Sequence, residues 1–329
     1  MIKISFCIPT YNFGKFIGET LQSIVDQASD EIEIEIVIGD GASTDNTRDI
    51  VRKFQDKFSF IHYYKFNNKG GIDKDLARTV ELSNGEYCWL LSADDVLMPG
   101  SINAMLKYIS SSNSIYLVNR VECDTSLNQI YTKSWLLDTQ LDREFDFSVS
   151  EELKEYLYLA TGLGSIFSFM SSIIVSKTEW NSIKIDDTFI GTNYSHVFRL
   201  FDIALSGGRI KYIKKPMIYA RLFNDSFMSN GIGKRFLIDL DGYKLVIYKF
   251  FDKMEAGNLI KSIMRKEHTW YQLLSLRSRV THKEWSDLHQ RFIFYRYGAI
   301  KLILIKFLGS KVKLVQLARR VKKIFYKKA

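Results

Sequence analysis

The first hundred residues repeat one pattern, in which a short apolar segment ends in a polar turn and a segment with helical periodicity follows. Apolar segments of strand length occur at residues 2–8, 32–38, 60–66 and within 84–100. Apolar side chains with helical spacing follow the first three, in residues 13–27, 46–58 and 73–83. Strands that alternate with helices in this way predict an α/β fold with a parallel, doubly wound sheet and functional loops along one edge.

Polar residues follow each predicted strand, at the sheet edge where α/β proteins bind ligands. The candidate binding residues there are Pro9, Thr10, Tyr11, Asn12, Asp40, Ser43, Lys74, Ser92, Ala93 and Asp94. Asp40 can accept hydrogen bonds from a base or ribose, and Lys74 can meet the charge of a phosphate. Each also has a structural explanation, since Asp40 can form a turn and Lys74 can lie on a solvated helix face. Their joint placement at successive strand ends favours a nucleotide site.

Two adjacent carboxylates end the fourth predicted strand. A turn at Asn84-Gly85 precedes an apolar run, which stops at Ser92-Ala93-Asp94-Asp95 before Pro99 permits a new helix. A carboxylate pair at the end of a buried strand can hold a divalent cation against a diphosphate. The alternative is a solvated helix cap, because Asp is common just before a helix.

Several classes of protein are not supported. The first loop contains neither Gly-x-Gly-x-x-Gly nor Gly-x-x-x-x-Gly-Lys-Ser/Thr, which argues against a dinucleotide oxidoreductase and a P-loop enzyme. The net charge of +9 does not indicate nucleic-acid binding, because residues 291–329 hold twelve Lys or Arg and no acid, which leaves 34 basic and 37 acidic residues before them. No signal-peptide pattern begins the chain, so we expect a cytoplasmic protein. Cys7, Cys88 and Cys123 lack metal-site spacing and are expected to be free thiols.

Five short motifs follow one another at the predicted strand ends. They are Pro9-Thr10-Tyr11-Asn12, Asp40 with Ser43-Thr44-Asp45, Asn68-x-Gly70, Gly85-Glu86-Tyr87 and Ser92-Ala93-Asp94-Asp95. In this order and spacing, residues 1–225 resemble the family 2 glycosyltransferases of the GT-A fold, and among them the abequosyltransferase-like enzymes of bacterial O-antigen assembly. The resemblance implies inverting transfer from a nucleotide-sugar donor with Mg²⁺ or Mn²⁺. It also implies that Asp40 contacts the donor base or ribose and that Asp94 is the metal ligand.

The chain departs from this family's pattern at three places. Ser92 replaces the first Asp of the usual Asp-x-Asp, so Asp94 and Asp95 are the remaining carboxylates. Asn193 stands in the region where many members have a catalytic Glu-Asp pair, and an amide cannot take a proton. Phe223 stands where a metal-binding His often occurs, and Arg221 is predicted to contact the donor phosphates in partial compensation. Two candidates remain for the base, His196 and the pair Asp186-Asp187, and the predicted catalytic residues are His196, Asp187 and Asp95.

Residues 111–225 are expected to form the acceptor side and residues 1–110 the donor side. A strand is predicted at 115–121 and a helix from Ser150. Trp135, Tyr156 and Tyr158 could stack on sugar rings, although isolated aromatic residues more often lie in the core.

Helical periods dominate the expected C-terminal region, 226–329, with helices predicted at 235–254, 259–279 and 282–294. The apolar run 299–308 is too short to span a bilayer, and it lies in the basic segment 292–328. An interfacial amphipathic helix on anionic lipid is one explanation, and a helix packed on the domain is the other.

The sequence thus predicts a metal-assisted inverting glycosyltransferase on the inner face of the bacterial cell membrane. By the resemblance, its acceptor is a polyprenyl-diphosphate-linked oligosaccharide. Two alternatives remain: a GT-A-fold nucleotidylyltransferase, disfavoured because the first loop is not a Gly-rich basic loop, and a degenerate member that binds nucleotide sugar without turnover.

Overall fold

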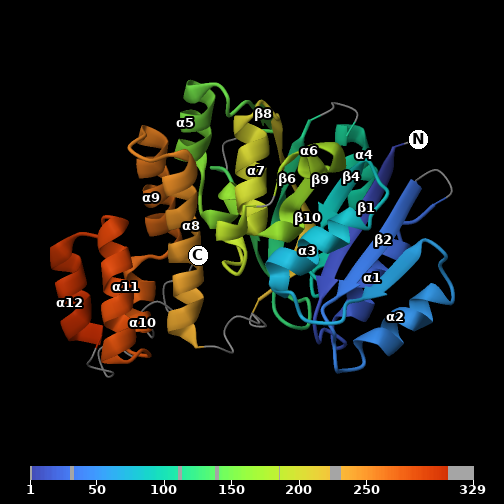
Figure 1. Cartoon of the computed structure of the whole chain (residues 1–329), viewed down its shortest axis with the longest axis horizontal. Coiled ribbons are helices and arrows are strands. Elements are labelled where there is room, and N and C mark those ends of the chain that lie inside the picture. The colour runs from blue at the N-terminus through green and yellow to red at the C-terminus, as the bar shows by residue number, and fades with distance from the viewer. Residues whose placement is uncertain are drawn as a thin grey trace. The chain divides into compact units, whose positions relative to one another are not determined.

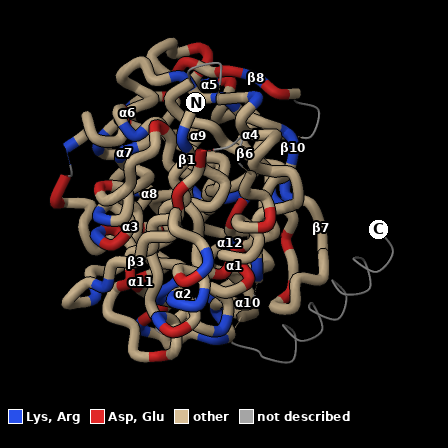
Figure 2. Tube along the Cα trace, turned by 90° about the vertical axis from the view of Figure 1, so that its right-hand side faces the viewer, with Lys and Arg blue, Asp and Glu red and all other residues tan. Residues whose placement is uncertain are grey.

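The computed structural model describes residues 2–29, 33–109, 113–137, 141–184, 186–222 and 231–309. The chain divides into two compact units, Met1–Asn224 and Asp225–Ala329. Figure 1 shows the strands gathered in the first unit and a set of helices in the second. The view in Figure 2 shows basic and acidic positions interspersed along the described chain.

The first unit alternates strands and helices, as predicted. Its strands are β1 (Lys3–Thr10), β2 (Glu33–Asp40), β3 (Ile61–Lys65), β4 (Tyr87–Leu90), β5 (Val96–Leu97), β6 (Ile115–Cys123), β7 (Gln129–Lys133), β8 (Arg143–Phe145), β9 (Ile173–Ser176) and β10 (Ile210–Arg221). Its helices are α1 (Ile17–Val25), α2 (Thr47–Gln55), α3 (Gly71–Glu81), α4 (Ser101–Ile109), α5 (Ser150–Leu159), α6 (Lys177–Ser182) and α7 (Ser195–Leu205).

All ten strands belong to one sheet. Its order is β3-β2-β1-β4-β9-β6-β10-β5, with β7 paired to β6 and β8 paired to β10. The pairs among β1, β2, β3 and β4 are parallel, and so is the pair β6–β10. Strand β9 is antiparallel to both β4 and β6, so β4 and β6 run in the same direction. The carboxyl ends of β1, β2, β4, β6 and β10 therefore meet at one edge, which we call the carboxyl edge. The predicted mostly parallel α/β sheet is confirmed.

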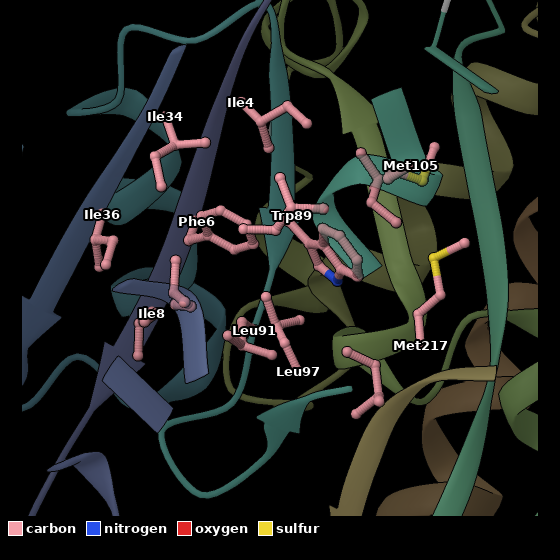
Figure 3. Close-up of a cluster of buried hydrophobic side chains, with 14 of the residues drawn as sticks. Ile4, Phe6, Ile8, Ile34, Ile36, Trp89, Leu91, Leu97, Met105 and Met217 are labelled. Carbon is pink, nitrogen blue, oxygen red and sulfur yellow. The ribbon is translucent and has the colours of Figure 1, made fainter. Parts of the chain in front are cut away.

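A buried apolar cluster fixes the strands on which the carboxyl edge depends. Phe6 on β1 and Trp89 on β4 stack with ring centroids 5.5 Å apart, and Figure 3 shows them between the isoleucines of β2 and Met105 of α4. Strands β1 and β2 are buried along nearly their whole length, which explains their continuous apolar sequence. Close packing of this kind sets the position of each strand end within narrow limits.

The second unit contains five described helices, of which two replace one predicted helix. They are α8 (Ile232–Phe250), α9 (Glu255–Glu267), α10 (Trp270–Arg277), α11 (His282–Phe294) and α12 (Ala299–Gly309). The single helix predicted over 259–279 is wrong, because Thr269 and Gln272 form a capping box that starts α10 anew. The Gln272 side chain accepts the Thr269 N–H at 2.7 Å.

None of the helices in the described part of the chain has the length and apolar character needed to span a bilayer.

Candidate active site

The ends of β1 and β2 are tied together by side-chain hydrogen bonds. Asn12 has a φ of 59°, a left-handed conformation that Asn tolerates better than most residues. Its Oδ1 accepts the N–H groups of Thr44 at 2.8 Å and Asp45 at 3.3 Å, and its own N–H donates to Ser43 Oγ at 2.8 Å. The first two sequence motifs therefore form one connected structure.

Asp40, at the end of β2, is fully buried and held on both carboxylate oxygens. Its Oδ1 accepts the Ser43 N–H at 2.7 Å, and the Tyr63 hydroxyl donates to Oδ2. Burial and this hydrogen bond raise the pKa of Tyr63 above its ordinary value. Tyr63 was not among the predicted site residues, because nothing local in the sequence marks which residue of β3 faces the end of β2.

The residues beside Asp40 offer polar groups for a ligand. The Thr10 hydroxyl is buried and has no hydrogen-bond partner among the described residues, which is costly unless a ligand supplies one. Tyr11 is half-buried, and the Lys69 ammonium lies 3.8 Å from the centre of its ring. Pro9 is a buried residue of β1, whereas Lys74 is exposed on α3.

The carboxylate loop, Ser92–Asp95, follows β4 directly. The Ser92 hydroxyl donates to Asp94 Oδ1. Asp95 is buried, and its Oδ2 accepts the Ser171 hydroxyl at 2.5 Å while its Oδ1 accepts the Arg221 N–H at 3.1 Å. Burial and the neighbouring Asp94 raise the pKa of Asp95 to about 7. The helix-cap alternative is wrong, because β5 follows this loop and α4 begins only at Ser101.

Arg221, at the end of β10, braces the carboxylate loop. Its Nη1 donates to the Asp94 carbonyl oxygen at 2.6 Å, and its Nη2 pairs with Glu19 at 2.5 Å. Its Nε donates to the Thr125 carbonyl oxygen at 3.3 Å. All three guanidinium nitrogens therefore have protein acceptors, and the geometry supports a bracing role more directly than the predicted contact with phosphate.

The loop before α7 wraps around a carboxylate that sequence reasoning missed. Asp73, in the first turn of α3, accepts the N–H groups of Gly191 at 2.9 Å, Asn193 at 2.8 Å and Ser195 at 3.0 Å. Gly191 and Asn193 have φ values of 88° and 67°, which suit glycine and asparagine. This loop is therefore fixed next to the N-terminus of α3.

The predicted catalytic residues differ in accessibility. His196 is buried, and neither ring nitrogen has a hydrogen-bond partner among the described residues. Burial lowers the pKa of His196 to about 4, against the opposing effect of Asp73, so the imidazole is neutral at pH 7. Asp187 is exposed at the start of the 3₁₀ turn Asp187–Phe189.

The three aromatic residues considered for sugar stacking divide into two groups. Trp135 and Tyr156 are buried, so for them a stacking role is wrong and the core explanation holds. Tyr158 is exposed on α5. Phe223 lies outside the described residues.

The carboxylate loop suits a divalent cation that also binds substrate. In the parts of the chain that the structure describes, no group of three or more His, Cys, Asp or Glu side chains is arranged to hold a metal ion. Mg²⁺ and similar cations commonly use only one or two protein carboxylates, with phosphate oxygens and water as the other ligands. Asp94 provides one such carboxylate, and the buried Asp95 beside it is held by Ser171 and the Arg221 N–H. The donor set therefore fits Mg²⁺ or Mn²⁺.

Comparisons with known proteins agree with this geometry. A model of glycosyl transferase family 2 matches residues 5–174. Abequosyltransferase RfbV of Salmonella typhimurium is 34% identical over 293 residues, which is 87% of each chain. The crystal structure of S. aureus TarS 1–349 matches with a TM-score of 0.65 at 15% identity, over 97% of this chain and 92% of that one.

A second solved structure extends the likeness in fold. The mannosyltransferase PcManGT from Pyrobaculum calidifontis, in complex with GDP-Man and Mn²⁺, has a TM-score of 0.52 at 15% identity, over 96% of this chain and 86% of that one. The sheet and the match to TarS confirm the expected GT-A fold. Taken with the family match and the identity to RfbV, they lead to one assignment: the chain belongs to glycosyl transferase family 2 and is a glycosyltransferase.

Proposed function

We propose that this enzyme transfers a sugar, with inversion, from a nucleoside-diphosphate sugar to a lipid-linked oligosaccharide of bacterial surface polysaccharide, such as O-antigen. The observation that carries the proposal is the carboxyl edge, where the buried Asp40 ends β2 and the carboxylate loop follows β4, the two strands that flank β1 in the sheet. The base and ribose would lie against Asp40, Thr10 and Asn12. The diphosphate would then lie by Asp94.

Asp94 would hold the divalent cation, with Asp95 behind it. When bound, Mg²⁺ or Mn²⁺ neutralises the charge that develops on the departing nucleoside diphosphate. Asp95 is fixed by Ser171 and the Arg221 N–H, so it keeps Asp94 oriented rather than moving with substrate. The Mn²⁺ bound with GDP-Man in PcManGT, a structure of the same fold, supports this assignment.

Inverting transfer needs a base that removes the acceptor hydroxyl proton. Asp187 is the better candidate of the two near α7, because its exposed carboxylate can reach an acceptor, whereas the neutral imidazole of His196 is enclosed. The Asp73 contacts support this placement, since they hold the loop between Asp187 and α7 in one conformation.

The similarity to RfbV and the surface of helix α12 support the proposed donor, acceptor and cellular location. Abequosyltransferase RfbV, by its name, transfers abequose, and a deoxyhexosyl donor is a reasonable first candidate here. Helix α12 exposes five large apolar side chains next to Lys301 and Lys306. A helix face of this kind can lie in the headgroup region of an anionic membrane, where a lipid-linked acceptor is found. We therefore assign the enzyme to the cytoplasmic surface of the cell membrane.

A panel of CDP-, UDP-, GDP- and dTDP-sugars tests the proposal, with melting temperature and nucleotide release measured with and without Mn²⁺. At least one donor should raise the melting temperature, because a ligand that binds only the folded state stabilises it. The same donor should release its nucleoside diphosphate in wild type but not in Asp94→Asn. Binding without any release would favour the non-catalytic alternative, and stabilisation by none of the donors would refute the proposal.

A further inference from the structure

A second arginine lies near the carboxylate pair and is not used by the roles described above. Arg120 is on β6 near its carboxyl end, and its guanidinium lies over the ring of Phe169, two positions before Ser171, whose hydroxyl donates to Asp95. Its side chain is 13% exposed. It therefore lies at the carboxyl edge, close to the carboxylate loop but largely withdrawn from bulk water.

The guanidinium of Arg120 is held in one orientation. Its centre lies 3.8 Å from the centre of the Phe169 ring and 4.7 Å from that of Trp135. Its Nη2 pairs with Glu122 at 2.6 Å. Contact with two aromatic rings and the pair with Glu122 leave the guanidinium N–H groups pointing in fixed directions.

One donor of this fixed fork has no acceptor. The Nε of Arg120 is buried and has no hydrogen-bond partner among the described residues. Arg221 differs in this respect, because protein oxygens accept from each of its guanidinium nitrogens. A buried donor without an acceptor is unfavourable in the free protein. Such a donor is expected at a binding site, where the ligand supplies the acceptor.

The order of the sheet indicates which part of a ligand would reach Arg120. Along the carboxyl edge, β2 presents Asp40, β4 leads to Asp94, and β6 lies beyond them across β9. If the proposed function is correct, the base lies by Asp40 and the diphosphate by Asp94. The group that continues past the diphosphate is the sugar to be transferred.

We propose that Arg120 and Glu122 bind the transferred sugar of the donor. A sugar hydroxyl both donates and accepts a hydrogen bond, so a guanidinium N–H beside a carboxylate oxygen can bind neighbouring hydroxyls together. The pair is then a specificity determinant that distinguishes sugars by the presence and direction of these hydroxyls. The inference rests on the proposed function, because it takes the position of the diphosphate from it.

Isothermal titration in Mn²⁺ tests the assignment on Arg120→Met, which keeps much of the side-chain length but removes every donor. The probes are the nucleotide sugar that most stabilises wild type and its free nucleoside diphosphate. We expect at least tenfold weaker binding of the nucleotide sugar and unchanged binding of the nucleoside diphosphate. Arg143→Met is the matched control, because Arg143 also stacks on a ring, Phe145 at 4.6 Å, and pairs with Glu155 at 2.5 Å.

Two results would overturn the assignment. Equal weakening of both ligands would mean that Arg120 acts through Asp95 or through the fold. Wild-type affinity for the nucleotide sugar would mean that Arg120 does not contact the donor. Failure of the proposed function is a different result, in which wild type itself binds none of the nucleotide sugars.

Discussion

The hydroxyl of Ser171 donates to Asp95 Oδ2, at one end of the carboxylate loop, at 2.5 Å. Ser171 Oγ also accepts the Ser92 N–H at 3.0 Å. Ser171 belongs to the 3₁₀ turn Met170–Ser172, just before β9. A residue from the expected acceptor side thus fixes both ends of the loop that would hold the metal.

Ser171→Ala should therefore affect stability and metal use together. The change removes the hydrogen bonds that Ser171 Oγ makes with Asp95 Oδ2 and with the Ser92 N–H, which should lower the free energy of unfolding by about 1–3 kcal/mol. It should also raise the Mn²⁺ concentration needed for half-maximal nucleotide release. Urea denaturation and a Mn²⁺ titration measure the two effects. Ser83→Ala is the control, since Ser83 is also buried and donates to the Val80 carbonyl oxygen away from the loop. If Ser171→Ala needs no more Mn²⁺ than wild type, Ser171 has only a structural role.

The two partners of the Arg221–Glu19 pair should respond unequally to mutation. The Arg221 side chain is fully buried, whereas that of Glu19 is 57% exposed. Arg221→Met removes the donors to the Asp94 and Thr125 carbonyl oxygens and should cost about 1.5–3 kcal/mol of unfolding free energy. Glu19→Gln removes only the charge of the exposed partner and keeps an oxygen that can accept from Arg221 Nη2, so it should cost less than about 1 kcal/mol. Chemical denaturation of both variants measures the two losses of unfolding free energy. Similar losses would show that the ion pair with Glu19, rather than the hydrogen bonds to the carbonyl oxygens, holds the loop.

The fold and the donor side could be predicted because their signals are local. Asp40 and Asn12 each follow an apolar run of strand length, and turn residues beside them limit the possible backbone conformations. The short strand β9 was not predicted, since a four-residue apolar run does not show whether it is helix or strand. The break at Thr269 had a readable signal, the spacing Thr-x-x-Gln, but apolar residues with helical spacing continue across it.

The contacts that brace the site could not be predicted from sequence. Ser171 and Asp95 are 76 positions apart, and Arg221 and Asp94 are 127 apart. Asp73 reaches the loop before α7 across more than 110 positions. Contacts at such separations depend on which strands become neighbours in the sheet, and no residue pattern in a single sequence records this.

Glu35 should make stability depend on pH. It is buried at the end of the sheet opposite the carboxyl edge, where it accepts the Ser5 hydroxyl at 2.5 Å and the Gly85 N–H at 3.1 Å. Burial alone raises the pKa of Glu35, but hydrogen bonds from Ser5 and Asn84 outweigh it and lower the pKa below the ordinary value. The carboxylate therefore stabilises the fold above the pKa of the unfolded chain, about 4.3, and this contribution is lost as the pH falls through the folded pKa.

Glu35→Gln should thus lower the free energy of unfolding at pH 7 by about 2 kcal/mol, and the difference from wild type should shrink as the pH falls below about 4. Urea denaturation at pH 7, 5, 4 and 3 measures this. Glu151→Gln serves as the control, because Glu151 is exposed and pairs with Lys154 at 3.1 Å. A difference that stays constant over this pH range would mean that the charge of Glu35 contributes nothing.

The exposed face of α12 should bind anionic lipid. The helix packs through the buried Leu302 and Ile305, while five large apolar side chains are 42–76% exposed: Ile300, Ile303, Leu304, Phe307 and Leu308. Lys301 and Lys306 lie among them, so apolar insertion and attraction to anionic headgroups act on the same helix. Each apolar side chain that leaves water should contribute about 1 kcal/mol or more.

Ile303→Ser combined with Phe307→Ser should therefore weaken binding to vesicles of phosphatidylcholine with 30% phosphatidylglycerol by at least about tenfold, which corresponds to 1.4 kcal/mol. Co-sedimentation measures the binding, and 0.5 M salt should weaken it in wild type because the lysine contribution is screened. Ile130→Ser, which changes an exposed apolar residue of β7, is the control. Equal sedimentation of wild type and the double variant would show that α12 does not contact the membrane, and the lipid-linked acceptor would then have to be reached by another surface.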